Sequence, residues 1–219
     1  MDPNLLQRRV GSGTTLQNEF LLQGSVLDES RDALLHKLRG FCDNSDVPPQ
    51  PFQDHEMSFV IKLTNGPSSS LRLRRSMDYP ENPWNLRYLG HHDTDRNRLA
   101  LARSCVDCNT TPSIAQFLQE MGFRLDFEFV LRGFMFRKGR MKILVYKIFR
   151  INGSSGIVNG TFNPNMNECL EPITQSHLVE LSVIAPAHQS SIAEEMKQFS
   201  DLLKPLIVLE NIDMRKLNS

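Results

Sequence analysis

FRLDFEFVLRGFMFRKGRMKILVYKIFRI, residues 123–151, carries the strongest strand pattern of the chain. Its first arm alternates apolar and polar residues with a period of two, which is typical of a strand buried on one face. The apolar positions of this arm are Phe123, Leu125, Phe127, Phe129 and Leu131. Gly139 then marks a tight turn, and a second apolar arm returns from Met141 to Ile151. The stretch therefore predicts a long antiparallel hairpin.

The alternation also predicts which side chains of the first arm enter the core. Burial of one large apolar side chain contributes ~1.5–3 kcal/mol before the entropy of folding is counted. Because Phe127 lies in the middle of the apolar face, we expect Phe127→Ala to cost ~3–5 kcal/mol of stability.

The second arm is apolar on both faces, with Ile143 and Val145 on one face and Leu144 and Tyr146 on the other. A strand of this kind has to be covered twice. One of the chain's own helices can supply the second cover, and so can a partner protein.

Phe134 and Phe136 fall out of phase with the apolar face of the first arm. We expect a bulge or a bend at Gly133, because glycine inside a strand often marks such a site.

The rest of the chain contains shorter alternating segments and a few helical ones. We expect further strands at 19–26, 57–63, 71–74, 84–89, 99–106 and 177–185, helices at 30–39, 111–121 and 191–203, a loop at 43–52 and a last strand at 207–209. About eight mostly antiparallel strands and about three helices favour a closed or nearly closed sheet, since closure removes exposed edges. The predicted fold class is α+β, dominated by antiparallel β structure, with a single β-barrel-like domain.

Domain boundaries follow from where the patterns stop. Residues 1–18 show no periodicity, and we expect a disordered N-terminal tail. The barrel domain is expected at 19–219, with a flexible loop at 152–176 that is rich in Gly, Asn, Ser and Pro.

Composition excludes several classes of protein. Lysine and arginine number 25, as do aspartate and glutamate, and the zero net charge argues against a dedicated nucleic-acid binder. No secretory signal or membrane-spanning segment is expected. The four cysteines fit free thiols in a reducing compartment better than a disulfide framework.

No motif of the chain predicts a catalytic, cofactor or metal site. The pair Cys105 and Cys108 lacks the second pair that a zinc site usually has. His91 and His92 are adjacent in a polar segment with no nucleophile nearby. Basic residues, including Arg132 and Lys147, cluster in the predicted strands, either as an ordinary polar face or as a surface for phosphate, RNA or an acidic partner.

Several segments, taken in order, carry a family resemblance. They are EFLLQGSVLD (19–28), LRGFCDN (38–44), RRSMD (74–78), PWNLRYLG (83–90), residues 120–151, LVELSVIAPA (178–187) and LKPLIVLENID (203–213). This ordered set resembles the family of subunit 18 of Mediator, the coactivator complex that links activators to RNA polymerase II. The resemblance implies a β-barrel in the Mediator head module, in the nucleus, with no enzymatic activity. It further implies a heterodimer with Mediator subunit 20, a site for the C-terminal helix of Mediator subunit 8, and indirect contact with other head subunits and the polymerase.

The barrel of this family is similar to the triphosphate-tunnel enzymes, which raises two alternative functions: a phosphohydrolase, or a module that binds RNA 5′ ends. The tunnel family carries Glu-x-Glu-x-Lys on its first strand, whereas here Glu19 is followed by Gln23 without a lysine. Ser182 stands where a second carboxylate beside Glu180 would be needed. Asp126 and Glu128 have the right spacing, but the flanking arginines favour a solvated charge ladder.

If the barrel works by contacting other proteins, its apolar strand positions are the first candidates. The residues that we expect to contact a partner are Trp84, Phe134, Phe136, Leu144 and Tyr146.

Overall fold

The structure is a computed structural model of the 219-residue chain. It describes residues 17–43, 45–62, 68–92, 99–152, 157–158, 161–162, 169–186 and 191–211. The expected N-terminal tail lies outside the described residues up to residue 16, and so do residues 153–156, 159–160 and 163–168 of the expected loop at 152–176. None of the described helices is both long and apolar enough to cross a membrane.

Strands dominate the described residues. They are β1 (Gln17–Leu27), β2 (Gln50–Ile61), β3 (Ser69–Ser76), β4 (Trp84–His92), β5 (Leu101–Thr110), β6 (Arg124–Lys138), β7 (Met141–Ile151), β8 (Ile157–Val158), β9 (Thr161–Phe162), β10 (Leu170–Pro172) and β11 (Ser176–Pro186). The helices are the short 3-10 helix η1 (Asp28–Ser30), α2 (Arg31–Phe41), α3 (Ile114–Glu120) and α4 (Ser191–Leu202).

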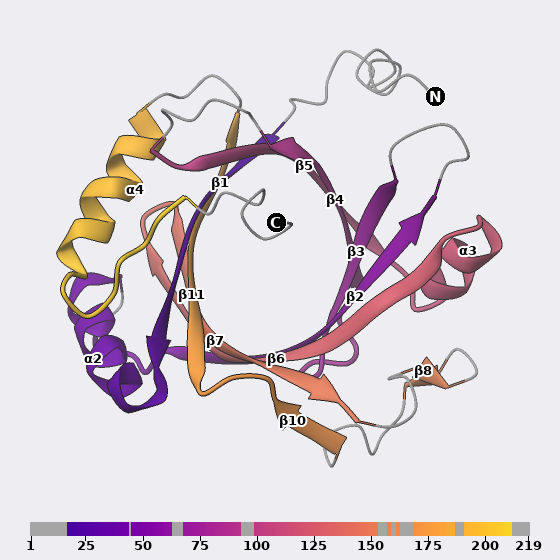
Figure 1. The fold of residues 1–219 in the computed structure, drawn as a ribbon, viewed down its shortest axis with the longest axis horizontal. Coiled ribbons are helices and arrows are strands. Elements are labelled where there is room, and N and C mark those ends of the chain that lie inside the picture. The colour runs from indigo at the N-terminus through magenta and orange to yellow at the C-terminus, as the bar shows by residue number, and fades with distance from the viewer. Residues whose placement is uncertain are drawn as a thin grey trace.

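Eight of these strands close into a barrel (Figure 1). The hydrogen-bonded order is β7-β11-β1-β5-β4-β3-β2-β6, and pairing of β6 with β7 closes the ring. Every pairing in the ring is antiparallel. The short β10 pairs with the C-terminal end of β7, and β8 and β9, of two residues each, form a separate hairpin. The predicted fold class is confirmed, and the hairpin at 123–151 contains the longest of the described strands, β6.

The largest core lies outside the barrel, between one flank of the sheet and the helices α2 and α4. Outward side chains of β1, β7 and β11, such as Leu22, Val145 and Leu181, pack there against Leu34 of α2 and Met196 of α4. Both helices present an apolar stripe to the sheet, and burial of this stripe stabilises each helix on the barrel surface. Figure 1 shows α4 and α2 one above the other along this flank.

A second core lies under α3 on another part of the outer wall. Met57, Phe59 and Leu73 of β2 and β3 pack there against Ala115 and Leu118 of α3. The parts of the outer face that α2, α3 and α4 cover are therefore apolar.

The apolar face predicted for the first arm of the hairpin is wrong in part. Ser58 pairs with Phe127 but its neighbour Phe59 pairs with Leu125, so a bulge at Asp126 shifts the register. The bulge puts Leu125 on the outer wall under α3 and Phe127 on the opposite side. Phe127 is 51% exposed, so the cost that we predicted for Phe127→Ala is also wrong.

Gly133 marks neither a bulge nor a bend in the pairing of β6 with β7, which continues without a shift. The glycine is instead a site of close approach. A Cβ atom added to Gly133 would lie 2.6 Å from both the Cα and the Cβ of Tyr146, the residue directly opposite. Phe134 and Phe136 therefore keep the regular alternation and point to the outer core.

Two smaller predictions also fail. The segment predicted as a loop at 43–52 contains the start of β2, where Pro51 pairs with Phe134. The predicted last strand at 207–209 is not one, because a single bridge between Glu210 and Gln23 is all that joins this segment to the sheet.

Candidate functional site: the barrel lumen and the outer cleft

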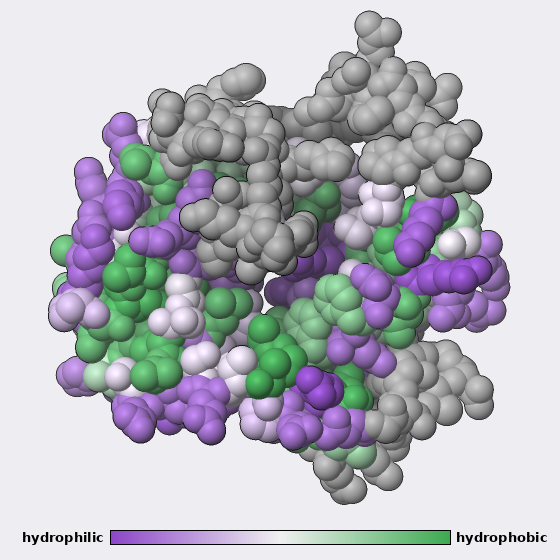
Figure 2. All heavy atoms as spheres, viewed as in Figure 1, coloured by the Kyte–Doolittle hydropathy of each residue, from purple (hydrophilic) through white to green (hydrophobic). Residues whose placement is uncertain are grey.

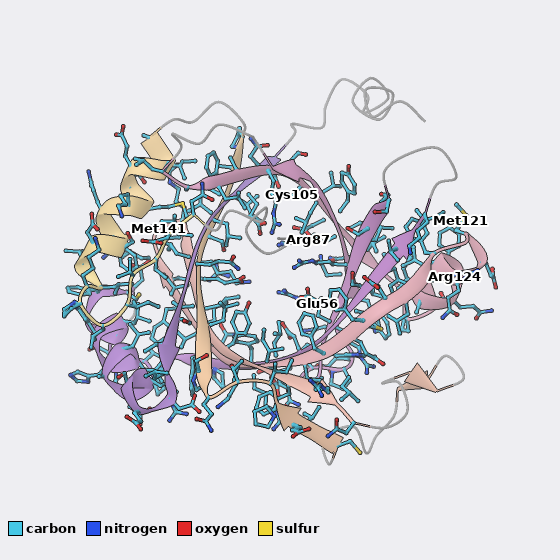
Figure 3. All side chains as sticks on the ribbon, in the orientation of Figure 1. Glu56, Arg87, Cys105, Met121, Arg124 and Met141 are labelled. Carbon is cyan, nitrogen blue, oxygen red and sulfur yellow. The ribbon has the colours of Figure 1, made fainter. Side chains whose placement is uncertain are left out.

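Part of the lumen of the barrel is lined by charged side chains. Figure 2 shows a hollow at the barrel mouth with hydrophilic residues inside it. In Figure 3, Glu56 and Arg87 both point into the barrel, from β2 and β4, the two strands that flank β3. The strands alternate inward and outward positions, so residues far apart in sequence meet in this space.

Glu19 of β1 is the first of two buried carboxylates in the lumen. Arg103 donates from Nε to Glu19 over 2.7 Å, and Arg87 donates from a terminal nitrogen over 3.0 Å. Arg87 also makes a bidentate pair with Asp107, with distances of 2.7 and 2.8 Å. Both oxygens of Glu19 are therefore occupied by arginines, which are the strong partners of carboxylates.

Glu56 of β2 is the second buried carboxylate and is held in the same way. Arg74 donates from Nε to Glu56 over 2.9 Å, and Arg72 lies 3.3 Å from the other oxygen. Burial by itself would raise the pKa of Glu56, but the charges of Arg74 and Arg72 outweigh it and hold the pKa below its usual value. Glu56 thus stays ionised as part of an ion-pair network.

Two further lumen groups are shifted toward their neutral forms. Burial raises the pKa of the Asp54 carboxyl. Burial also lowers the pKa of Lys142, and the positive charges of Arg74 and Arg87 lower it further. Asp54 and Lys142 thus differ from Glu56, whose arginine partners hold its pKa low.

Another part of the lumen, along β6 and β7, contains a cluster of apolar side chains. Leu131, Leu144 and Tyr146 are buried there, with Phe52 packed edge-on against Tyr146 at 6.2 Å between ring centres. Burial, followed by the charge of Glu180, raises the pKa of Tyr146 far above its usual value. The second cover of the apolar strand β7 is therefore the lumen cluster of this chain.

The arrangement bears on the chemistry of a triphosphate tunnel, which needs open carboxylates for a divalent metal. The lumen-facing carboxylates Glu19 and Glu56 already accept hydrogen bonds from two arginines each. Glu180 accepts a hydrogen bond from the amide of Gln23. Within the described ranges, no group of three or more His, Cys, Asp or Glu side chains is placed to hold a metal ion.

Asp126 and Glu128 do not form the solvated ladder that the sequence predicted. Asp126 lies at the bulge and is exposed. Glu128 lies 2.8 Å from Nε2 of His55, which is fully buried. Burial lowers the pKa of His55, and the hydrogen bond to Glu128 opposes this only in part.

The cysteine pair of β5 is split between two environments. Cys105 is buried and Cys108 is exposed, and neither is in a disulfide. Residues three apart on a strand face opposite sides, so this pair cannot bind one ion. Burial also raises the pKa of Cys105, which disfavours the reactive thiolate.

Four of the five residues predicted to contact a partner are buried within the chain. Trp84 lies under α3 beneath the guanidinium of Arg75, at 5.0 Å. Phe136 lies in the core under α2 and α4, and Leu144 and Tyr146 lie in the lumen. Only Phe134 lines an open cleft. Partner contact by these residues stays a prediction.

That cleft is on the outer wall and has a volume of about 520 Å³. Its floor is formed by β6 and β7, including Arg132, Phe134 and Lys147. Asp28 and His177 reach it from other elements and were not singled out from the sequence. Asp28 bonds to Lys147 and lies 2.9 Å from His177. Because these partners are more than a hundred residues away along the chain, no local sequence pattern predicts the contacts.

Fold and site together define a closed eight-stranded antiparallel barrel, with helices on one flank and lumen carboxylates that are paired to arginines. The family model described as Med18 protein matches residues 18–75 and 61–219. The chain belongs to this family, and the resemblance read from the sequence is confirmed.

Individual relatives agree over nearly the full length. Mediator of RNA polymerase II transcription subunit 18 from Xenopus tropicalis is 47% identical over 216 residues, covering 98% of each chain. The protein of the same name from Drosophila melanogaster is 46% identical over 200 residues, covering 91% of this chain and 88% of its own. A chain in the structure of the Schizosaccharomyces pombe Mediator head module has a TM-score of 0.67 at 17% identity, covering 89% of this chain and 98% of that one. The last similarity shows the shared fold.

Proposed function

We propose that this chain is a non-enzymatic structural subunit of the Mediator head module that acts in the nucleus through contacts with other proteins. The observation that carries the proposal is the identity of 47% to a Mediator subunit over 98% of both chains. The structural similarity to a chain of a Mediator head module supports the place within the complex.

The lumen supports the non-enzymatic part of the proposal. A tunnel hydrolase needs carboxylates that can bind a metal, whereas Glu19 and Glu56 are each bonded to two arginines. Opening these sites would leave charged arginines unpaired in a buried space, which is costly. We therefore expect no release of phosphate from a triphosphate substrate with added manganese. Release that Glu19→Ala abolishes would establish the hydrolase instead.

The partners proposed are Mediator subunit 20, as a heterodimer, and the C-terminal helix of Mediator subunit 8. The outer wall supports contacts of this kind, because large apolar side chains stay exposed there in the isolated chain. Tyr88 and Val106 lie directly opposite each other on β4 and β5, and they are 36% and 51% exposed. Phe117 of α3 and Met121, which follows that helix directly, are also exposed.

Co-expression with tagged subunit 20 and the subunit 8 helix tests the proposal. We expect both to co-purify with the full chain in one peak on size exclusion. Val106→Glu should weaken capture of at least one partner, whereas Gln198→Glu, which adds the same charge at an exposed position of α4, should not. If neither partner is captured by the wild-type chain, the proposal fails; if Val106→Glu has no effect, the interface lies elsewhere on the barrel.

A further inference from the structure

Four side chains in the outer wall of the barrel form one connected series across four strands. His55 of β2 lies directly opposite Arg75 of β3, and Arg75 donates a hydrogen bond from Nε to Nδ1 of His55 over 3.2 Å. On the other side of the ring, Nε2 of His55 lies 2.8 Å from a carboxylate oxygen of Glu128 on β6. The guanidinium of Arg75 lies over the ring of Trp84 on β4, at 5.0 Å from the ring centre. We call these four residues the His55 relay.

The contacts of the His55 relay fix the protonation state of its central ring. Because Nδ1 accepts a hydrogen bond from Arg75, the proton of the neutral ring is on Nε2, which donates to Glu128. A second ring proton would turn Nδ1 into a donor that faces the N–H of Arg75. The hydrogen bond between Arg75 and His55 therefore exists only while His55 is neutral.

The charged groups that act on His55 come from three strands. Burial lowers the pKa of His55, the hydrogen bond to Glu128 opposes this, and the charge of Arg75 adds to it. Glu56 of β2 acts on the ring as well, although it points into the barrel on the other side of the sheet (Figure 3). Glu120, which is the charged residue of α3, is exposed to solvent. Among these groups Arg75 carries the only positive charge, so a proton on His55 would repel Arg75.

Arg75 connects the ring of His55 to the core under α3. Trp84 is buried in that core together with Ala115 and Leu118 of α3, and Arg75 is itself buried beside it. Attraction to the ring holds the guanidinium over Trp84, and the hydrogen bond to His55 orients it there. When an imidazolium faces Arg75 instead, that bond is lost and the two positive charges repel. The guanidinium then moves toward solvent, and one face of Trp84 loses its cover.

From this geometry we propose that the His55 relay is a pH-sensitive switch in the outer wall, in which a proton taken up from solvent by Nδ1 of His55 releases Arg75 from Trp84 and loosens the packing of α3. Phe117 of α3 and Met121 after it are exposed, so the switch changes a surface that the proposed partners can contact. It goes beyond a place in the Mediator head, because it is a property of the isolated chain and needs no partner.

Intrinsic fluorescence reports the switch directly, because Trp84 is the only tryptophan of the chain. In a pH titration of the full chain, we expect the emission of Trp84 to shift to longer wavelength below pH 6.5, the ordinary pKa of His55, since water reaches a ring that was buried. Circular dichroism of the same samples should keep the strand signal through this step. No shift before acid unfolding, or a shift that coincides with loss of the strand signal, would overturn the proposal.

Three substitutions assign the step to the His55 relay. His55→Gln cannot take up the proton and should show no step. Arg75→Lys keeps the charge but lacks the planar guanidinium, so its emission should lie at longer wavelength already at neutral pH, again without a step. His177→Gln is the matched control and should keep the step, because His177 is also a buried histidine beside a carboxylate, Asp28, but lines the outer cleft.

If His55→Gln does not fold, Arg75→Lys and His177→Gln carry the test. A step that persists in His55→Gln or Arg75→Lys, or that His177→Gln removes, would refute the switch.

Discussion

Arg74 donates a hydrogen bond of 2.9 Å from its Nε to a carboxylate oxygen of Glu56, its direct neighbour across β2 and β3. Arg72 lies 3.3 Å from the other oxygen. These contacts show how the lumen is stabilised. Each of the buried carboxylates Glu19 and Glu56 accepts hydrogen bonds from two arginines, and these bonds join different strands of the barrel. A barrel that carries such pairs around its inner wall holds its strands together through charge as well as through backbone hydrogen bonds.

Removing the charge of Glu56 should destabilise the whole barrel. Glu56→Gln leaves Arg74 and Arg72 without their counterion, and loss of one partner of a buried pair costs ~3–5 kcal/mol. Chemical denaturation measures this loss. Glu29→Gln is the matched control, since Glu29 is exposed and should change stability by less than about 0.5 kcal/mol. Equal stability of the two variants would mean that Glu56 is more exposed to water than it is in the structure.

Stability should also depend on pH through His55. Burial lowers the pKa of His55 below its ordinary value of 6.5, so the unfolded chain binds a proton that the folded chain resists. The stability due to neutral His55 is therefore complete above pH 6.5 and is lost as the pH falls from 6.5 toward the folded pKa. Denaturation at a series of pH values should show this slope, and His55→Gln should flatten it. An equally steep slope in the variant would assign the proton uptake to another group, such as His177, whose pKa burial also lowers.

Gly133 should tolerate no side chain. A Cβ atom there would lie 2.1 Å from the carbonyl oxygen of Val145 and 2.6 Å from the Cα of Tyr146, both of them backbone atoms that cannot turn away. We expect Gly133→Ala to cost at least about 2 kcal/mol. Gly40→Ala provides the contrast, since nothing lies within 4 Å of its added Cβ and the residue is helical. That variant should gain up to about 1 kcal/mol. Thermal unfolding of both variants checks the difference in sign.

The sequence predicted the closed antiparallel sheet because alternation and turn residues are local signals. Residues 123–151 gave the hairpin correctly, and the apolar character of both faces of β7 correctly indicated two covers. Which face looks inward could not be predicted, since the outer wall is buried under helices and half of the lumen is apolar too. A pattern of period two cannot distinguish two buried faces.

The candidate site was harder to predict because its parts are remote in sequence. Glu19 and Arg103 are separated by 84 positions, and Lys147 and Asp28 by 119. The sequence placed Lys147 and Arg132 among basic strand residues, but only the closed barrel brings Asp28 and Arg31 beside them. Phe134 was predicted to contact a partner because it falls out of phase with the apolar positions before Gly133. It lines the cleft because the alternation of inward and outward side chains along β6 continues through Gly133.

The bulge at Asp126 can be tested with two phenylalanines on opposite sides of the same strand pair. Phe59 is 1% exposed in the core under α3, whereas Phe127 is 51% exposed and only stacks on Phe129, at 5.9 Å between ring centres. We expect Phe59→Ala to cost ~3–5 kcal/mol and Phe127→Ala less than about 1 kcal/mol. Because the residue type and the substitution are identical, the difference in unfolding free energy reports position alone. Similar costs for both would place Phe127 in the core, and would mean that the strand alternates without a bulge, as its sequence pattern suggests.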